Sequence, residues 1–343
     1  MLILFQDGIP DIFFSALAQR GFTTARFSTA TDKAARTFQE NPSATAIFFR
    51  ANFRLNAPLL DLLPQLKLAA LVSTGADNVD AQALAQRGIR LTTGEGANAR
   101  AVFDYVLQAL CYGGFDFERD KLGVVGAGSI GSLLIGFFRE IGAAVAHYDP
   151  FRAETGSLSE VLASDVVTFH VPLTAAGPHA TQAMLNAEYF SKVQKPLQII
   201  QASRGGIWNA DFYAQLASHP QLKILAQDVY PQEPPHPRDL ARARFSTPHI
   251  AGYSTRGRLG GIVKGLAALA PELAAAVAYP AGEAWFLENE AERFAAQPQL
   301  FNQLRDRYGW RKEFHEYNAT EREAFLQKFP QLPQRVRARL FDF

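Results

Sequence analysis

The sequence has very little of several features that define whole classes of protein. It has 343 residues and one cysteine, Cys111, so the chain can form neither an internal disulfide nor a cysteine-rich zinc site. The formal net charge is +1, so no overall field favours nucleic acid or an anionic membrane. No apolar run approaches the roughly 20 residues that a membrane-spanning helix needs. These absences predict a soluble, cytoplasmic protein that works on a small molecule, without a nucleic-acid or membrane partner.

Short apolar runs alternate with helical patterns along most of the chain. The first run lacks the basic residues and cleavage site of a signal peptide and predicts a buried strand. Strands are expected at 1–5, 45–49, 68–72 and 89–91, and then at 122–125, 144–148, 166–169, 197–201 and 224–227. Helices are expected at 11–20, 31–39 and 81–86 in the first set. Strands that alternate with helices predict parallel sheets with both faces covered.

This pattern predicts an α/β protein with two doubly wound parallel-sheet domains. Helices near 98–110 and 255–279 would join them, the second interrupted by Pro271. Residues 98–254 would form a Rossmann dinucleotide-binding domain. Residues 281–343 are crowded with aromatic residues and predict a small helical extension. Its aromatic side chains would either form a local core or cover a partner subunit.

A glycine-rich segment leads from one predicted strand into a helix. Leu122-Gly-Val-Val-Gly-Ala-Gly-Ser-Ile-Gly131 has the order strand, turn and helix. In such a segment Gly126 permits the tight turn, Gly128 lets the backbone approach a pyrophosphate, and Gly131 permits close helix–strand packing. The N–H groups at the helix start would hold the phosphates. The segment therefore predicts a dinucleotide site.

A carboxylate follows the next predicted strand. Asp149 lies 18 positions after Gly131. A carboxylate there can accept hydrogen bonds from both ribose hydroxyls of NAD and would repel the 2′-phosphate of NADP. The alternatives are a solvent-facing aspartate that opens the Asp149-Pro150 turn, and accommodation of NADP by the nearby Arg152. We predict NAD as the cofactor.

Three residues that follow successive strands are candidates for catalysis. Arg204 follows the strand at 197–201, Glu233 follows Asp228-Val-Tyr, and His249 lies in Ser-Thr-Pro-His-Ile-Ala-Gly-Tyr. An arginine can hold a substrate carboxylate with two hydrogen bonds, and a histidine can take and return a hydroxyl proton near neutral pH. A carboxylate beside the histidine stabilises its protonated form. Taken singly, a surface arginine–glutamate pair or a capping histidine would explain them equally well.

No metal site is expected, because the histidines and carboxylates lack spacings such as two histidines one helical turn apart. His170 ends a predicted strand beside Val171-Pro172. We interpret it as a structural residue rather than a catalytic one.

These segments together resemble the D-isomer-specific 2-hydroxyacid dehydrogenase family, from about residue 40 to about residue 280. The matching phrases are Ser-Thr-Gly-Ala-Asp-Asn-Val-Asp (73–80), Gly-Ala-Asn-Ala (96–99), the glycine turn, Phe-His-Val-Pro-Leu (169–173), Ala-Ser-Arg-Gly, Asp-Val-Tyr and Pro-His-Ile-Ala-Gly-Tyr. The family resemblance implies an NAD-dependent oxidoreductase that acts on the CH–OH group of a small 2-hydroxy acid. It also implies a flavodoxin-like substrate domain built from 1–97 and 255–280, and a homodimer for which 281–343 would supply contacts.

The same resemblance implies roles for single residues. Arg204, Glu233 and His249 match the catalytic triad of the family. Cofactor contacts are implied for Gly126, Gly128, Ser129, Ile130, Gly131, Asp149, Val171, Ala202, Asp228 and Gly252. Substrate contacts are implied for Ser73, Thr74, Gly75, Arg204 and Tyr253.

Within the family, Thr-Pro-His-Ile-Ala-Gly-Tyr-Ser (247–254) and part of the tail (301–308) are similar to the branch that acts in pyridoxal phosphate synthesis. That branch oxidises 4-phosphoerythronate to 2-oxo-3-hydroxy-4-phosphobutanoate. It places a serine after an arginine where this chain has Arg50-Ala51, which counts against a phosphorylated substrate. Two alternatives stay open: a reductase of another 2-oxo acid, such as glyoxylate or hydroxypyruvate, and a regulatory protein that senses the dinucleotide without turnover.

Overall fold

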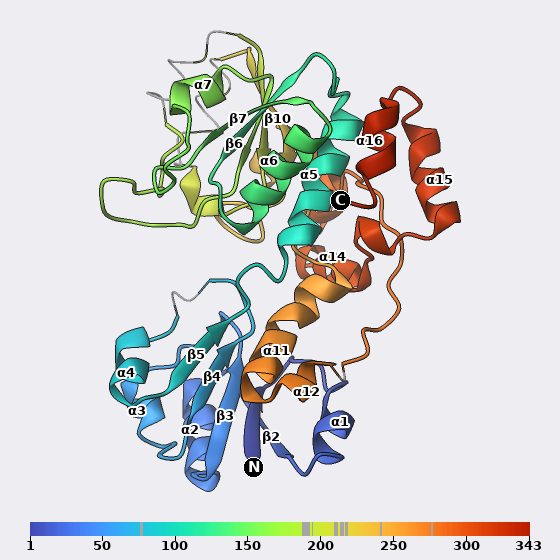
Figure 1. Ribbon diagram of the computed structural model, residues 1–343. Coiled ribbons are helices and arrows are strands. Elements are labelled where there is room, and N and C mark those ends of the chain that lie inside the picture. The colour runs from blue at the N-terminus through green and yellow to red at the C-terminus, as the bar shows by residue number, and fades with distance from the viewer. Residues whose placement is uncertain are drawn as a thin grey trace. The chain divides into compact units, whose positions relative to one another are not determined.

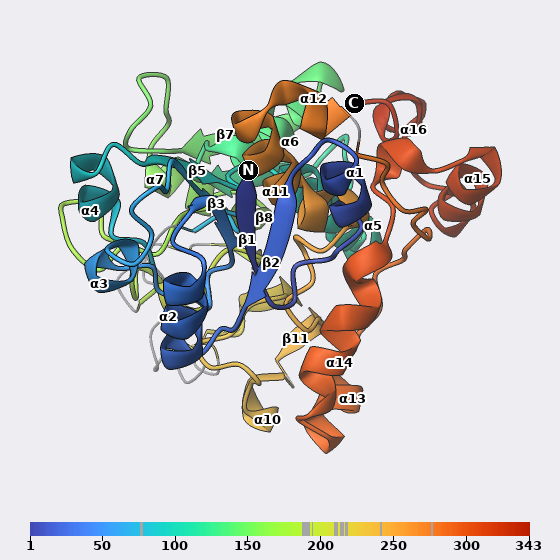
Figure 2. The same ribbon diagram turned by 90° about the horizontal axis from the view of Figure 1, so that it is seen from below.

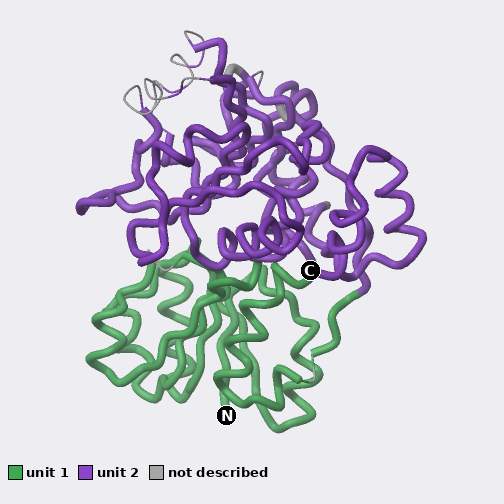
Figure 3. Tube along the Cα trace, turned by 45° about the horizontal axis from the view of Figure 1, so that its top comes forward, with its two compact units in different colours: residues 1–98, 256–280 green, residues 99–255, 281–343 purple. Residues whose placement is uncertain are grey.

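The structure, a computed structural model, describes residues 1–343 except 76–77, 187–192, 194, 209–211, 213–215, 217–218, 241 and 276. The chain divides into two compact units (Figure 3). Unit 1 comprises 1–98 and 256–280, and unit 2 comprises 99–255 and 281–343. The extension is therefore part of the second unit rather than a separate body. Among the described helices, none has the length and apolar character needed to cross a membrane.

Unit 1 is built on a five-stranded parallel sheet in the order β2-β1-β3-β4-β5. Its central strand β3 is buried on both faces. Ile47 and Phe49 pack on one face, while Ala46 and Phe48 pack on the other. This order is that of a flavodoxin-like sheet. The strands are β1 (Leu2–Gln6), β2 (Thr23–Phe27), β3 (Ala44–Phe49), β4 (Leu68–Leu71) and β5 (Arg90–Thr93). The helices are α1 (Phe14–Ala18), α2 (Thr31–Glu40), α3 (Ala57–Leu60), α4 (Ala81–Gln86), α11 (Thr255–Leu269) and α12 (Pro271–Ala275).

Unit 2 is built on a six-stranded parallel sheet in the order β11-β10-β9-β8-β6-β7 (Figure 1). The order reverses between β6 and β8, which is the switch point where ligands bind in doubly wound sheets. The strands are β6 (Lys121–Val125), β7 (Ala144–Tyr148), β8 (Val166–Phe169), β9 (Leu197–Gln201), β10 (Leu222–Gln227) and β11 (Ala243–Ser246). The helices around it are α5 (Ala99–Gly113), α6 (Ser129–Glu140), α7 (Leu158–Leu162) and α10 (Pro237–Leu240), with a short 3₁₀ helix η1 (Gly205–Ile207).

Two strands and two helices differ from the sequence prediction. The strands β2 and β11 were not predicted; each is the outermost strand of its sheet and is only partly buried. The expected helix at 11–20 is confined to α1, and the expected helix at 255–279 is broken into α11 and α12. The break comes directly before Pro271, because the residue before a proline disfavours helical backbone.

The extension packs its aromatic side chains into the core of unit 2. Its helices are α13 (Ala291–Ala296), α14 (Leu300–Arg307), α15 (Ala319–Lys328) and α16 (Gln334–Arg339), with η2 (Tyr308–Trp310) and η3 (Phe314–Glu316). The Trp285 ring stacks on Tyr105 of α5 with centroids 6.1 Å apart, and Phe314 and Phe325 are buried in the same cluster. In Figure 1, α16 lies beside α5 and α15 lies on the far side of α16, and Figure 2 shows α14 next to α13. The expected separate local core is thus corrected: these side chains complete the core of unit 2.

Candidate functional site

The glycine turn joins β6 to α6 at the switch point of unit 2. Gly126 has φ +92°, a left-handed conformation that favours glycine. A Cβ on Gly126 would lie 2.5 Å from the His170 carbonyl oxygen, and one on Gly131 would lie 1.9 Å from the Gly126 oxygen. Glycine is therefore required at both positions for the strand, the turn and the helix to pack this closely.

The exposed side of the turn is open. A Cβ on Gly128 would meet nothing within 4 Å, and Gly128 begins α6 without a side-chain cap. Ser129 and Ile130 form the first residues of the helix, and Ser129 is exposed. The first N–H groups of a helix have no partner inside it and attract anions. The turn and helix start thus fit a pyrophosphate group.

Asp149 lies at the end of β7, against the same turn. Its carboxylate accepts hydrogen bonds from Ala127 N at 2.8 Å and Phe151 N at 3.0 Å. The Arg152 guanidinium donates to the Ala127 carbonyl at 3.1 Å. The turn therefore carries both the carboxylate expected to bind the ribose and the arginine that could accommodate a 2′-phosphate.

Val171 and Ala202 follow the neighbouring strands β8 and β9. The side chain of Val171 would contact a Cβ on Gly126 at 3.1 Å, so Val171 also borders the turn. His170 is buried, and its Nε2 pairs with the Thr168 hydroxyl at 2.9 Å. Burial lowers the pKa of His170 to about 3. The ring is therefore neutral at physiological pH, which fits a structural role.

His249 and Glu233 form a close pair after β11 and β10. The Nδ1 of His249 lies 2.8 Å and 2.9 Å from the two carboxylate oxygens of Glu233. Because the carboxylate can only accept, Nδ1 is the donor and Nε2 is left as the proton acceptor. His249 has φ +57°, which is uncommon for a residue with a side chain and is found where surrounding structure holds it.

Glu233 is stabilised as a carboxylate. Its side chain is 24% exposed, and it pairs with both His249 and Arg305. Burial alone would raise the pKa of Glu233, but the hydrogen bond from His249 and the charges of His249 and Arg305 outweigh it. The net pKa is below the usual value, so Glu233 stays ionised beside the imidazole.

Asp228 holds the loop that carries His249. Its carboxylate accepts from the Thr247 hydroxyl at 2.6 Å, Ile250 N at 2.7 Å and Ala251 N at 2.8 Å. Burial raises the pKa of Asp228. The structure thus gives Asp228 a bracing role on both sides of His249, while a direct cofactor contact for Asp228, and one for Gly252 in the same loop, stay predictions.

Arg204 lies on the adjacent loop, after β9. Its guanidinium donates to the Ser203 carbonyl at 2.9 Å. A Cβ on the next residue, Gly205, would lie 1.7 Å from the Tyr230 carbonyl oxygen. Only a glycine lets the loop after β9 approach the loop that leads to Glu233 this closely. The three predicted catalytic residues therefore follow three neighbouring strands, β9, β10 and β11.

The predicted substrate contacts fall in both units. Ser73, Thr74 and Gly75 follow β4 in unit 1 and are partly buried, whereas Tyr253 follows the His249 loop in unit 2. The Ser73 hydroxyl oxygen is buried and has no hydrogen-bond partner among the described residues. A buried hydroxyl without a partner is costly, so this atom is suited to receive a ligand group.

Two arginines of the extension contact the His249 loop and were not predicted from the sequence. Arg305 donates to the Pro248 carbonyl at 3.0 Å. Arg311 is buried and donates to the carbonyls of Ala251 and Tyr253. The sequence signals near them were the aromatic residues of the tail and the similarity at 301–308, and neither indicated a role at the site.

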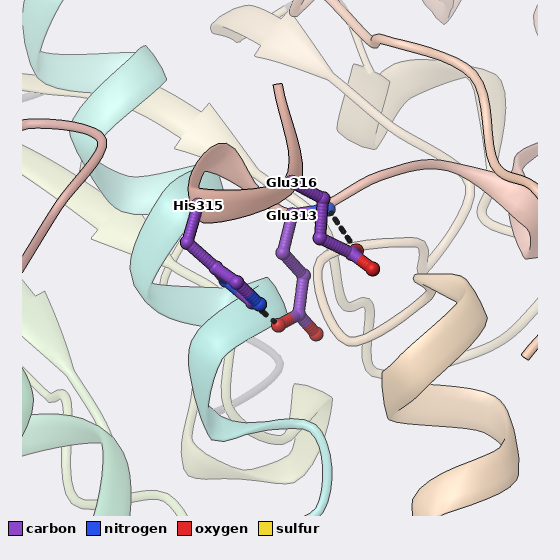
Figure 4. Close-up of side chains that lie close together, drawn as sticks. All are labelled: Glu313, His315 and Glu316. Carbon is purple, nitrogen blue, oxygen red and sulfur yellow. Dashed lines mark hydrogen bonds and ion pairs between the residues drawn. The ribbon is translucent and has the colours of Figure 1, made fainter. Parts of the chain in front are cut away.

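A cluster of three side chains in the extension brings potential metal ligands together. One ligand atom each from Glu313, His315 and Glu316 lies within 4.8 Å of the others (Figure 4). Each carboxylate already has a protein partner. Glu313 accepts from the Ser254 hydroxyl at 2.7 Å, and Glu316 accepts from the backbone N–H of Glu313 at 2.9 Å. The contact with Ser254 ties η3 to the segment that follows His249.

Unit 2 thus has the architecture of a dinucleotide-binding domain, with a histidine–carboxylate pair after β10 and β11 of the sheet that carries the glycine turn after β6. Residues 104–251 match the family model "D-isomer specific 2-hydroxyacid dehydrogenase, NAD binding domain". This stretch of unit 2 is therefore similar to the NAD-binding domain of that family, which agrees with the NAD cofactor predicted from the glycine turn and Asp149.

Sequence relatives point in the same direction. The chain is 32% identical over 238 residues to erythronate-4-phosphate dehydrogenase of Tolumonas auensis, covering 66% of this chain and 63% of the relative. It is 34% identical over 233 residues to the protein of the same name from Aeromonas hydrophila, covering 64% and 62%. The chain therefore spans less than two thirds of the length of these relatives.

Solved structures share the fold. The TT0316 protein of Thermus thermophilus superposes with a TM-score of 0.64 at 24% identity, covering 79% of this chain and 96% of that one. The NADPH-dependent glyoxylate/hydroxypyruvate reductase of Sinorhizobium meliloti gives 0.64 at 20% identity, covering 84% and 99%.

Proposed function

We propose that the chain is an NAD-dependent dehydrogenase that oxidises the 2-hydroxyl group of a small 2-hydroxy acid, and that this acid is 4-phosphoerythronate. The observation that carries the proposal is the His249–Glu233 pair, with a 2.8 Å contact at Nδ1. That contact fixes the ring so that Nε2 can receive a proton. The likeness to relatives named erythronate-4-phosphate dehydrogenase supports this choice of substrate.

Each predicted site residue has a separate role in the proposed reaction. NAD bound at the glycine turn would supply the acceptor for the hydride that leaves C2 of the acid. His249 takes the hydroxyl proton at Nε2, and Glu233 stabilises the imidazolium that results. Arg204 holds the substrate carboxylate, since a guanidinium matches its two oxygens. The glycine turn and the start of α6 hold the pyrophosphate, and Asp149 binds the adenine ribose.

An assay of purified protein tests this proposal. We expect NADH to form from NAD and 4-phosphoerythronate, with much slower reduction of NADP. A matched panel should contain D-glycerate and D-lactate, together with glyoxylate and hydroxypyruvate in the reverse direction with NADH. No turnover of 4-phosphoerythronate alongside rapid turnover of another acid would reject the substrate but keep the reaction class.

A second candidate function is reduction of another 2-oxo acid. It is favoured by Ala51, which follows Arg50 where the phosphoerythronate branch has a serine. Without that hydroxyl, the phosphate has one hydrogen-bond donor fewer. In that case Ala51→Ser should improve the KM for 4-phosphoerythronate and leave the KM for glyoxylate unchanged.

We also propose that the protein is a homodimer, as the family resemblance implies. In the described part of the extension, many aromatic side chains are already buried within unit 2. Any dimer surface must therefore use the exposed remainder, such as Trp310 at 38% exposure. Light scattering on the full chain would decide, and a monomer at all concentrations would reject the proposal.

A further inference from the structure

One side chain of the extension contacts Glu233 and the residue before His249. Arg305 lies on α14. Its Nη2 donates to Oε2 of Glu233 at 2.6 Å, and its Nε donates to the carbonyl of Pro248 at 3.0 Å. Pro248 is the residue directly before His249. A single guanidinium therefore contacts the carboxylate that holds the imidazole and the backbone that carries it.

The helix that carries Arg305 is itself fixed in place. Phe301 is fully buried, and with Leu304 it packs against Tyr230 and Leu240. The guanidinium carbon of Arg305 lies 4.8 Å from the centre of the Phe301 ring, within range of a cation–π contact. The Arg305 side chain is 21% exposed. A planar group held at one ring, one carbonyl and one carboxylate loses little further freedom when it orients Glu233.

We propose that Arg305 is a positioning residue for proton transfer: it fixes the rotation of the Glu233 carboxylate and the backbone of His249, and so aims Nε2 of the imidazole. Both carboxylate oxygens lie within 2.9 Å of Nδ1, so His249 alone does not select one rotation of the carboxylate. Arg305 selects it by binding Oε2. The carbonyl contact at Pro248 restrains a loop whose next residue is in the left-handed region.

The charge of Arg305 also bears on the pair. Among the described residues, the charged groups that act on the pair are Arg305 from α14, which acts on Glu233, and Asp228 from the end of β10, which interacts with His249. Arg305 is one of the influences that lower the pKa of Glu233. Removing this cation raises the pKa of Glu233, so the carboxylate becomes protonated at a higher pH. The acid side of the pH–rate profile should then move to higher pH, which a loss of packing alone would not produce.

The test compares three variants with the wild-type protein. The proposal rests on the proposed function, so all four are assayed with NAD and the best acid from the substrate panel. In Arg305→Met we expect kcat to fall by up to about 100-fold, because small misplacements of a reacting group have effects of that order. The KM for the acid and the Kd for NAD should not change. Arg305→Lys keeps the positive charge but loses the planar guanidinium. Its pH–rate profile should therefore match the wild type on the acid side, while kcat recovers only in part.

Arg322→Met is a matched control. Arg322 also belongs to the extension, with Nε on the Tyr317 carbonyl at 2.9 Å, Nη1 on Asp342 at 2.9 Å, and its guanidinium over the Phe341 ring at 5.2 Å. Like Arg305, it contacts a backbone carbonyl, a carboxylate and an aromatic ring, but it does not contact Glu233. The control should match the wild type in kcat and pH profile.

Two results would overturn the proposal, and a third would overturn the proposed function instead. If Arg305→Met keeps the wild-type kcat and acid limb, Arg305 does not position the pair. The same conclusion follows if kcat, NAD affinity and Tm decline together in Arg305→Met and Arg322→Met. If the wild-type protein binds NAD but turns over no acid, the proposed function fails first. Carbon NMR titration of Glu233 would then still report whether Arg305→Met raises its midpoint, as the ion pair requires.

Discussion

At the scale of single residues, His249 combines a left-handed backbone with a fully engaged Nδ1 atom. The backbone is held at the loop by Asp228, and the ring is held by Glu233 at 2.8 Å. Such a conformation has a cost on the order of 1–3 kcal/mol and persists only where the surroundings determine it. The arrangement leaves Nε2 as the free position of the ring for proton transfer.

Replacing His249 by Asn tests that role. Asparagine also tolerates the left-handed region, so the loop should keep its shape. Loss of the proton acceptor should lower kcat by about 100- to 10,000-fold, the usual range for general acid–base catalysis. The Kd for NAD, measured by fluorescence titration, should stay at the wild-type value. Residual turnover near the wild-type rate would show that another group moves the proton.

Gly131→Ala tests the geometry of the glycine turn. The added Cβ would lie 1.9 Å from the Gly126 carbonyl oxygen, a backbone atom that cannot move aside. Overpacking of this kind costs about 1–3 kcal/mol. Since about 1.4 kcal/mol is a factor of ten, NAD binding should weaken about tenfold or more if the strain falls on the turn.

Gly136→Ala is the matched control in the same helix. Its Cβ would meet only the end of the Phe343 ring at 3.3 Å, and alanine favours helix over glycine. The Kd for NAD should not change in this variant. Equal effects of both substitutions would contradict the assignment of Gly131 to the turn.

At the scale of elements, the sequence predicted the described central strands and the edge strands β5 and β7, but missed the edge strands β2 and β11. The strand at 166–169 and the strand at 197–201 have the predicted bounds, because both are apolar and buried on two faces. By contrast β2, Thr-Thr-Ala-Arg-Phe, is polar and half exposed, so its apolar pattern is weak. It is a strand because β1 pairs with it, a tertiary cause that local pattern does not contain.

In the candidate site, too, some residues could be predicted from the local sequence and others could not. Glu233 could be predicted because it follows a recognisable strand, and His249 because it lies in the segment Ser-Thr-Pro-His-Ile-Ala-Gly-Tyr and carries a suitable side chain. Arg305 could not, since it lies 72 positions from Glu233 and occupies an ordinary amphipathic helix. Only the packing of α14 on Tyr230 and Leu240 brings it to the pair. That packing depends on the whole of unit 2.

Asp104 of α5 tests how the extension is joined to the sheet domain. Its buried carboxylate accepts from Phe314 N at 2.7 Å. Burial raises the pKa of Asp104 well above its usual value. A raised pKa gives stability that is present below the unfolded-state pKa and is lost as pH rises through the folded-state pKa. Relative to wild type, Asp104→Asn should therefore gain Tm as pH increases from about 4 to about 8.

Asp116→Asn provides a control of opposite sign. The backbone N–H of Glu118 and the side chain of Arg119 lower the pKa of Asp116. The stability that the ionised Asp116 carboxylate contributes is lost only as pH falls. The Tm difference between Asp116→Asn and wild type should therefore not change with pH above about pH 5. Thermal melts across the pH series measure both variants. An Asp104→Asn variant whose Tm falls relative to wild type as pH rises would contradict the buried-acid interpretation.

At the scale of the whole molecule, the extension is structural for unit 2. Trp285, Phe314 and Phe325 are buried with residues of α5 and α6 in one cluster. Each buried aromatic contributes about 1.5–3 kcal/mol of transfer free energy, so losing several is comparable with the roughly 5–15 kcal/mol by which a domain is usually stable.

A chain that ends at Pro280 should therefore fail to fold its NAD-binding unit. We expect it to bind dye that marks exposed apolar surface, to lack a cooperative thermal transition for unit 2, and to show no NAD binding in calorimetry. A truncated protein that binds NAD with the wild-type Kd would show that unit 2 is stable without the extension.

The position of Arg305 and Arg311 in the chain has a consequence for synthesis. A ribosome makes the glycine turn, Glu233 and His249 long before it reaches the two arginines that hold the His249 loop. Because domains fold in the order in which they leave the ribosome, the loop emerges before its supports exist. A nonsense codon anywhere between 250 and 304 would thus leave every predicted cofactor and catalytic residue up to His249 in the product, yet without the contacts of Arg305 and Arg311 that support the His249 loop.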